Sequence, residues 1–473
     1  MRILKHRDLV FALAATLIFF LIAVSVPVYD ATNGLHNVFF GDYKIVWQDG
    51  RSPENFYIIK DMISDKPAVF PPDFVFRDVA AKDNYDFFES NGKYIPLFNT
   101  RPTYLFAIIL KPFNFLSDLN LFKAISLLVV AFYSASLFVF YFVQRHLGLR
   151  STTAFFSTLV GGIATSIFIY SHYFFLIEVV STLFLFLFLY FVLKYWNTKS
   201  RPASYLLPAL FVLFFFFFTL SAILFTLFAV VILYFIYYRD KVFGSLKTFI
   251  AVSAIGVALT FLVAFYLVGF ENISHTDTWY QVGMFRTFSG YVNADDFNIY
   301  GFHDNSTQNR LFAYVYSFQK SPENAVFLHL SGLFGSLFGE KGFIYNSIFL
   351  AFSILGMFLY KNKEKGYFTI ALIVLFVLIL SSRFEWYGGV IPRYVRTFDI
   401  PILLLTFFSF YFIQENKSRI VLIIFIAALL ISVLNVVSLA VRTDWTYEQH
   451  SQLISYDLIL WPFPANTSSI PIT

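Results

Sequence analysis

The chain has 473 residues and a net charge of +5; 58% of its residues are hydrophobic, 13% are charged, and its mean hydropathy is +0.68. This composition is far from that of soluble domains and places the chain in a lipid bilayer, where basic loops orient a polytopic protein. The positive charge therefore does not indicate nucleic-acid binding. The sequence contains no cysteine, which excludes disulfides, thiol chemistry and a Cys-ligated metal.

Apolar runs of membrane-spanning length recur along the chain. The first run, 9–28, follows three basic residues, and we expect a retained span that enters from the cytoplasm. The run 204–238 is too long for one crossing, so we expect two short spans joined by a turn. Further spans are predicted at 124–143, 152–171, 174–193, 248–269, 343–360, 367–382, 398–414 and 420–441. The sequence thus predicts an all-α polytopic membrane protein with about eleven transmembrane helices.

The loops between these spans are predicted to lie on two faces of the membrane: short basic loops on one face and long loops on the other. The run 103–117 is short and is broken by Lys111 and Pro112, so we expect an interfacial helix there. Short basic loops then fall on the cytoplasmic side with the N-terminus: Arg145, Arg150, Lys194, Lys199, Arg201, Arg239, Lys241, Lys247, Lys361, Lys363, Lys365, Lys417 and Arg419. We expect one transmembrane domain over 1–441, with extracytoplasmic loops at 29–123, 270–342 and 383–397, and an extracytoplasmic tail at 442–473.

Two of the predicted extracytoplasmic loops have an excess of one kind of charge. Residues 29–100 carry eleven acidic side chains against seven basic ones, whereas the loop 383–397 carries three arginines against one acid, with Asp399 just inside the following span. Arginines on this face run against the positive-inside bias and need a further reason. Carboxylate oxygens suit hard cations and guanidinium groups suit phosphate oxygens, so these loops are candidates for holding a divalent cation and a phosphate.

A lone carboxylate, Glu178, lies inside the apolar run 174–193. A charged side chain at membrane depth is costly to bury and is by default a functional candidate. Lys341 precedes the span 343–360, where its ammonium group would meet a lipid phosphate.

Four stretches after the acidic loop resemble, in order, landmarks of the GT-C superfamily of membrane glycosyltransferases, and most closely its protein-mannosyltransferase-like prokaryotic branch. They are "NGKYIPLFNTRPTYLFAIILKPFNFL", "GGIATSIFIYSHYFFLIEVVSTLFLFLFLYFVLKYW", "GLFGSLFGEKGFIYNSIFLAFSILG" and "WYGGVIPRYVRTFDIPILLL". The resemblance implies a GT-C-like fold, with juxtamembrane helices in the long first loop. It also implies an extracytoplasmic active site that uses a polyprenyl-phosphate sugar.

The resemblance also assigns site residues. Asp49, before an amphipathic juxtamembrane helix, corresponds to the catalytic acid of the first loop, with Asp30 as the competing choice. Glu178 corresponds to the second acid. Basic groups for the lipid phosphate correspond to Arg393, Lys341 and Arg396. Asp49 and Glu178 are also the expected ligands of a divalent cation, Mg or Mn.

The expected activity is hexosyl or pentosyl transfer, with inversion, to an acceptor hydroxyl on a glycan, lipid or protein. A carboxylate serves as base, and preorganised cations stabilise the charge of the leaving phosphate. The expected setting is the cell membrane of a prokaryote, with membrane lipids as partners and no nucleic acid. Two alternatives remain open: a non-catalytic lipid-binding scaffold of the same fold, and a polytopic transporter.

Overall fold

The computed structural model describes the chain in separate stretches: residues 6–26, 28–30, 34–36, 56, 59–60, 63–64, 87–90, 93–96, 101–172, 176–198, 337, 343–381 and 399–441. The chain divides into two compact units. Unit 1 comprises Met1, 44–132 and 174–313, and unit 2 comprises 2–43, 133–173 and 314–473. Each unit is described by itself.

The described residues of unit 1 include a hairpin and several helical segments. Strands β3 (Phe87–Ser90) and β4 (Lys93–Pro96) pair antiparallel, with Phe87 opposite Pro96. They are followed by α4 (Arg101–Leu110), the 3-10 helix η1 (Lys111–Phe113), the first part of α5 (Asp118–Leu147) and α8 (Leu176–Thr198). The helix predicted at 103–117 is confirmed as α4 and η1. The α-helix gives way to the 3-10 helix at Lys111 and Pro112, because proline has no N–H to continue the α-helical hydrogen bonding and its ring crowds the preceding turn.

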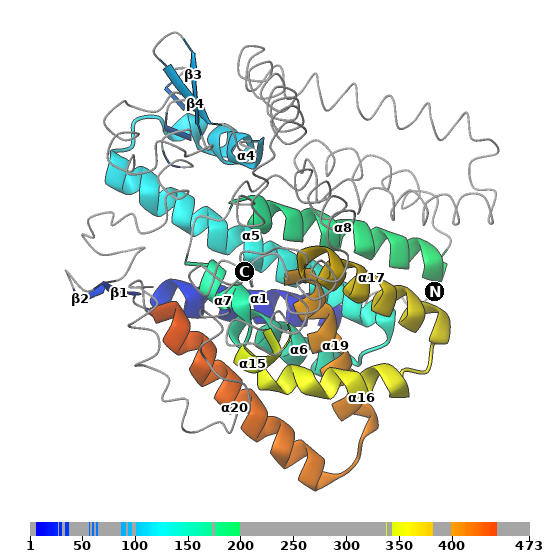
Figure 1. The fold of residues 1–473 in the computed structure, drawn as a ribbon. Helices are drawn as coiled ribbons and strands as arrows, with labels where there is room; N and C mark the ends of the chain where they lie inside the picture. The colour runs from blue at the N-terminus through cyan, green and yellow to red at the C-terminus, as the bar shows by residue number, and fades with distance from the viewer. Residues whose placement is uncertain are drawn as a thin grey trace, which may run out of the picture. The chain divides into compact units, whose positions relative to one another are not determined.

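Unit 2 contains most of the described helices (Figure 1). They are α1 (His6–Ser25), the second part of α5, α6 (Ser151–Ile163), α7 (Ser166–Tyr170), α15 (Phe343–Asn346), η3 (Ile348–Ala351), α16 (Phe352–Leu359), α17 (Lys363–Ser381), α19 (Asp399–Glu415) and α20 (Arg419–Val441). A short antiparallel hairpin, β1 (Val28–Asp30) and β2 (Gly34–His36), follows α1. The described residues are mostly helical, as predicted. The two short hairpins, at the start of the predicted loop 29–123 and within it, were not predicted.

Three helices of the described residues are long and apolar enough to cross a membrane: His6–Ser25, Asp118–Leu147 and Arg419–Ser438. Large apolar side chains face outward on them, among them Leu17 at 58% exposure and Ile420 at 70%. Lipid tails cover such a surface without cost, because they are themselves apolar. The fold is thus that of a helical membrane protein, while the predicted count of about eleven spans extends into residues outside those described.

Two runs that the sequence predicts as single spans are interrupted. The run 152–171 is divided between α6 and α7 by Ala164 and Thr165, and the run 343–360 is divided into α15, η3 and α16. At the first break, Thr165 Oγ1 accepts a hydrogen bond from Ile167 N and donates one to Gly161 O. The hydroxyl thereby satisfies backbone groups that an unbroken helix would have paired, which is how membrane proteins tolerate such interruptions.

The helices of unit 2 pack closely where glycine allows it. Helices α16 and α19 lie side by side, and a Cβ atom added at Gly356 would lie 2.0 Å from the carbonyl oxygen of Phe408 (Figure 1). An added Cβ at Gly162 of α6 would lie 2.6 Å from the ring of Phe19 in α1. Small residues permit this close backbone approach, which provides the packing between helices that the hydrophobic effect cannot supply in lipid.

Candidate functional site

Helix α19 begins with a buried carboxylate. Asp399 is 2% exposed, and its Oδ2 accepts a hydrogen bond from the hydroxyl of Tyr133 on α5 at 3.1 Å. Tyr133 is itself fully buried. The local sequence explains why the helix starts here, because an acid at the first position complements the helix dipole and Pro401 is tolerated in the first turn.

The length of α19 sets the distance between Asp399 and the other end of the helix. Glu415 ends α19, so Asp399 lies about 24 Å from it along the helix axis. The hydrocarbon core of a bilayer is about 30 Å thick. The sequence predicts a span at 398–414, and a helix that crossed there would have Asp399 near the interface opposite Glu415. Its structural role is to start and anchor α19, and a buried acid at this depth is also a functional candidate.

The arginine-rich loop leads directly into this helix. Arg396 precedes Asp399 by three residues, and a chain of three residues spans at most about 11 Å. Arg393 precedes it by six residues, a reach of at most about 22 Å. Both arginines belong to the loop whose side chains lie outside the described residues. The length of the connecting chain alone therefore limits how far both arginines can lie from Asp399.

The predicted site residues fall mostly outside the described residues. Asp49, Lys341, Arg393 and Arg396 all lie there, so the structure brings none of them together. Glu178 lies in the first turn of α8, in unit 1, and only its backbone is described. The competing first-loop acid, Asp30, is placed as the last residue of β1, where it pairs in register with Gly34.

The described residues contain no group of three or more His, Cys, Asp or Glu side chains that would hold a metal ion. The two expected ligands, Asp49 and Glu178, contribute no described side chain. A divalent cation therefore stays a prediction of the sequence, and no catalytic step is derived through it.

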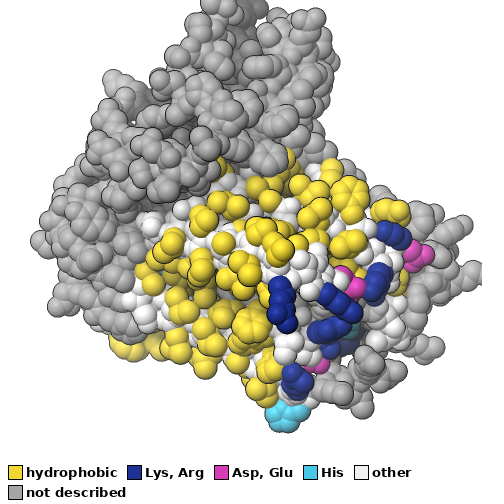
Figure 2. All heavy atoms as spheres, turned by 90° about the horizontal axis from the view of Figure 1, so that it is seen from below, with side chains coloured by type: hydrophobic (Ala, Val, Ile, Leu, Met, Phe, Trp, Pro, Cys, Tyr) yellow, Lys and Arg dark blue, Asp and Glu magenta, His cyan; other side chains and the backbone are white. Residues whose placement is uncertain are grey.

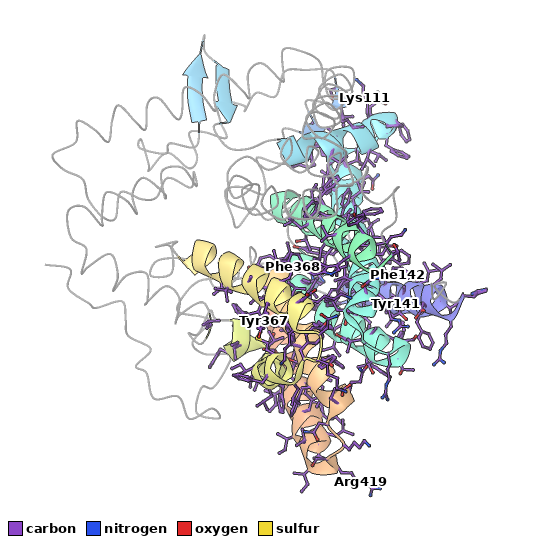
Figure 3. All side chains as sticks on the ribbon, turned by 90° about the vertical axis from the view of Figure 1, so that its right-hand side faces the viewer. Lys111, Tyr141, Phe142, Tyr367, Phe368 and Arg419 are labelled. Atoms are coloured by element: carbon purple, nitrogen blue, oxygen red, sulfur yellow. The ribbon has the colours of Figure 1, made fainter. Side chains whose placement is uncertain are left out.

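The opposite end of unit 2 is held by a second buried acid. Asp8 of α1 is 4% exposed, and its Oδ1 accepts hydrogen bonds from Tyr141 OH at 2.9 Å, Arg145 Nε at 2.9 Å and Ser151 Oγ at 2.7 Å. These three donors come from α5 and α6, so one carboxylate joins three helices. Figure 3 shows Tyr141 on α5, beside its neighbour Phe142. We interpret this cluster as structural.

Further contacts assemble the remaining loops at the same end. Arg150 N donates to Gln414 Oε1 at 2.7 Å, and Tyr360 OH donates to Leu147 O at 2.6 Å. Lys361 donates a hydrogen bond to Glu415 and forms an ion pair with it. The hydrogen bond raises the pKa of Lys361 above its ordinary value. We call this region the basic end; its charged residues are Arg7, Asp8, Arg145, Arg150, Lys361, Lys363, Glu364, Lys365, Glu415, Lys417 and Arg419.

The basic end confirms one relationship predicted from charge alone. The loops that carry Arg145 and Arg150, Lys361 to Lys365, and Lys417 and Arg419 lie with the N-terminal end of α1. Whether this end faces the cytoplasm stays a prediction. Sequence reasoning did not select Asp399 as a site residue. The signal was present, because an acid at a span boundary directly follows an arginine-rich loop.

No family model matches the chain, and no curated protein matches it. Among solved structures, it is similar to the oligosaccharyltransferase of Archaeoglobus fulgidus in complex with Zn and sulfate, with 12% sequence identity and a TM-score of 0.48. The alignment covers 95% of this chain and 56% of that one, so the chain spans about half the length of that protein. A TM-score below 0.5 carries no argument about fold or function. The class that the fold itself defines is a helical membrane protein.

Proposed function

We propose that the chain is a membrane glycosyltransferase that moves a hexosyl or pentosyl group from a polyprenyl-phosphate donor to an acceptor hydroxyl on the extracytoplasmic face. Transfer inverts the anomeric carbon. The acceptor is a glycan, a lipid or a protein, and the enzyme works in the cell membrane of a prokaryote. The proposal begins from the sequence resemblance to the GT-C superfamily and from the charges of the two extracytoplasmic loops.

The chemistry requires two kinds of group. Breaking the sugar–phosphate bond leaves negative charge on the lipid phosphate, which Arg393, Arg396 and Lys341 would stabilise. The acceptor hydroxyl must lose its proton as it attacks, and Asp49 would take that proton as general base, with Glu178 as the second acid. A divalent cation, Mg or Mn, bound by Asp49 and Glu178 would add further positive charge at the leaving phosphate.

The single observation that supports this proposal best is the buried start of α19. Asp399, held by Tyr133, anchors the point at which the arginine-rich loop enters α19. Arg396 is within about 11 Å of that anchor whatever path the loop takes. Guanidinium groups at the predicted interface would meet the phosphate of a lipid-borne donor where its head group reaches water.

The test is turnover of a radiolabelled polyprenyl-phosphate sugar by the purified protein in detergent, with and without EDTA. Release of the lipid phosphate with transfer of the label is the expected result. Asp49→Asn should lower turnover by at least about a hundredfold, the lower end of typical acid–base contributions. Asp30→Asn is the matched control and should stay active; the reverse pattern would make Asp30 the first-loop acid.

The outcomes separate the alternatives. Binding of the labelled donor without turnover would replace the enzyme by a non-catalytic lipid-binding scaffold. A polytopic transporter is the second candidate, and the broken helices α6/α7 and α15/η3 favour it, because transporters form substrate sites at interrupted helices. In sealed proteoliposomes, a transporter would move the intact donor across the bilayer, whereas the enzyme would cleave it.

A further inference from the structure

The basic end of unit 2 has more positive charge than its internal contacts use. Of its three acids, Asp8 is buried against Arg145, and Glu415 is paired with Lys361. Only Glu364 is exposed without an ion pair among the described residues. Two of the three negative charges are therefore already paired with cations of the same end.

Five cations at this end are exposed and form no ion pair among the described residues: Arg7, Arg150, Lys363, Lys417 and Arg419. Figure 2 shows Lys and Arg side chains gathered along one side of a surface that is otherwise mostly hydrophobic. Like charges gathered at one end of the unit repel one another, so an anion bound among them would reduce this repulsion.

The turn between α19 and α20 shows how an anion and an apolar chain would fit together. Lys417 and Arg419 are exposed at this turn, and Figure 3 shows Arg419 at the free end of α20. Directly beyond them, Ile420 is 70% exposed and Ile423 is 66% exposed. Ile423 lies about 6 Å along the helix axis from Arg419. Two exposed cations at this turn are thus followed directly by exposed apolar side chains of α20.

We propose that the basic end binds the head groups of anionic phospholipids, with Lys417 and Arg419 as its principal contacts. A phospholipid has a phosphate next to its acyl chains. At the turn, the cations would contact the phosphate and the neighbouring exposed isoleucines would contact the acyl chains. A nucleic acid or an acidic protein would satisfy the cations and leave the isoleucines unused. This inference stands apart from the proposed glycosyl transfer, because it concerns the end of the bundle opposite Asp399.

The experiment follows the thermal unfolding midpoint of the full chain in a neutral detergent, read by intrinsic tyrosine and tryptophan fluorescence. Short-chain phosphatidylglycerol is titrated in parallel with phosphatidylcholine of the same chain length. Phosphatidylglycerol should raise the midpoint saturably, because a ligand that binds only the folded state stabilises it by mass action. Adding 0.5 M NaCl should weaken this effect, since salt screens exposed charges.

The double variant K417Q/R419Q removes both cations and should bind phosphatidylglycerol about thirtyfold more weakly than the unmodified chain. K417R/R419K keeps both charges and should bind normally. K123Q removes a cation from α5 about 33 Å of helical rise away from Arg145 and should also bind normally. The single variants K417Q and R419Q are measured beside them and should each lose part of the affinity, which keeps the test valid if the double variant does not fold.

Four results would overturn the proposal. They are an equal shift with phosphatidylcholine, an equal shift with inorganic phosphate alone, an equal shift with a short RNA, and unchanged affinity in the glutamine variants. The first would mean that acyl chains bind without regard to charge. The second and third would mean that the end binds anions in general or nucleic acid.

Discussion

The hydroxyl of Ser347 donates a 2.7 Å hydrogen bond to the carbonyl oxygen of Ala164, and both residues are buried. Ala164 caps the C-terminal end of α6 at the first helix break, and Ser347 precedes η3 at the second. Two interruptions that are 183 residues apart in the chain are thus joined directly. The second break is also tied to α20, because Phe349 N donates to Ser432 Oγ at 3.4 Å.

Ser347→Ala should therefore lower the free energy of unfolding by about 1–3 kcal/mol, because a buried carbonyl loses its donor. The thermal unfolding midpoint in detergent measures this. Ser409→Ala is the matched control, since that buried hydroxyl donates only to Leu405 O within its own helix. Equal effects of the two substitutions would mean that the link between the breaks contributes nothing of its own.

The Asp8 cluster should behave as a coupled unit. Asp8→Ala and Arg145→Ala should each destabilise the protein by about 3 kcal/mol, because the first leaves the Arg145 guanidinium without its carboxylate and the second leaves the buried Asp8 charge with only the neutral donors Tyr141 and Ser151. The double variant should cost clearly less than the sum of the two, which a double-mutant cycle on unfolding measures. The exposed pair Lys361 and Glu415 serves as the comparison and should show little coupling. Strict additivity at Asp8 and Arg145 would contradict the cluster.

Gly356→Ala should separate α16 from α19. The added Cβ would lie 2.0 Å from the carbonyl oxygen of Phe408, and backbone cannot move aside as a side chain can. We expect destabilisation of about 1–3 kcal/mol or more, the usual cost of overpacking. Phe358→Ala on the same helix, where the ring is 77% exposed, should have a small effect on the unfolding midpoint. A fully stable Gly356→Ala protein would show that the helices do not cross this closely.

Topology is accessible through single cysteines in this cysteine-free chain. Cysteine at Ser418, exposed at the basic end, and at Ser200 should resist an impermeant maleimide in intact cells. Cysteine at Ser274 or Ser468 should react, because both belong to the predicted extracytoplasmic segments. Labelling of Ser418 and Ser200 with protection of the other two would reverse the predicted orientation.

Arg393 distinguishes a phosphate ligand from an interfacial anchor. If it forks onto the donor phosphate, both Arg393→Lys and Arg393→Ala should weaken polyprenyl-phosphate binding by about tenfold or more, because an ammonium group does not reproduce the planar fork. If it only anchors the loop, Lys should serve as well, since both side chains reach the same interface. Thermal stability of each variant is the control. Normal binding by the Lys variant would leave the phosphate to Lys341 or Arg396.

Several features were predictable because their causes are local. Pro112 ends α4, Asp399 and Pro401 favour the start of α19, and composition alone indicates a membrane protein. The gathering of basic loops beside the start of α1 was also predictable, since charge bias acts on each short loop separately. These statements need no knowledge of which helix lies beside which.

The helix breaks were not predicted, because both lie inside apolar runs that contain no proline, and the small and polar residues at them, Gly161, Gly162, Thr165, Ser166, Asn346 and Ser347, are also tolerated inside helices. Hydropathy reports whether a residue suits lipid, and it does not report whether its backbone is helical. At the break, the hydroxyls of Thr165 and Ser347 bond to backbone groups, and Ser347 comes from a distant part of the chain.

The sequence by itself determined the membrane setting, the positions of several helix ends and the side on which basic loops gather, because these depend on composition and on neighbouring residues. Only the tertiary structure decided which buried acids have which partners. Tyr133 and Asp399 are 266 residues apart, and Tyr141 and Asp8 are 133 apart. Such pairs form only when packing brings distant helices together, and burial then makes each hydrogen bond obligatory.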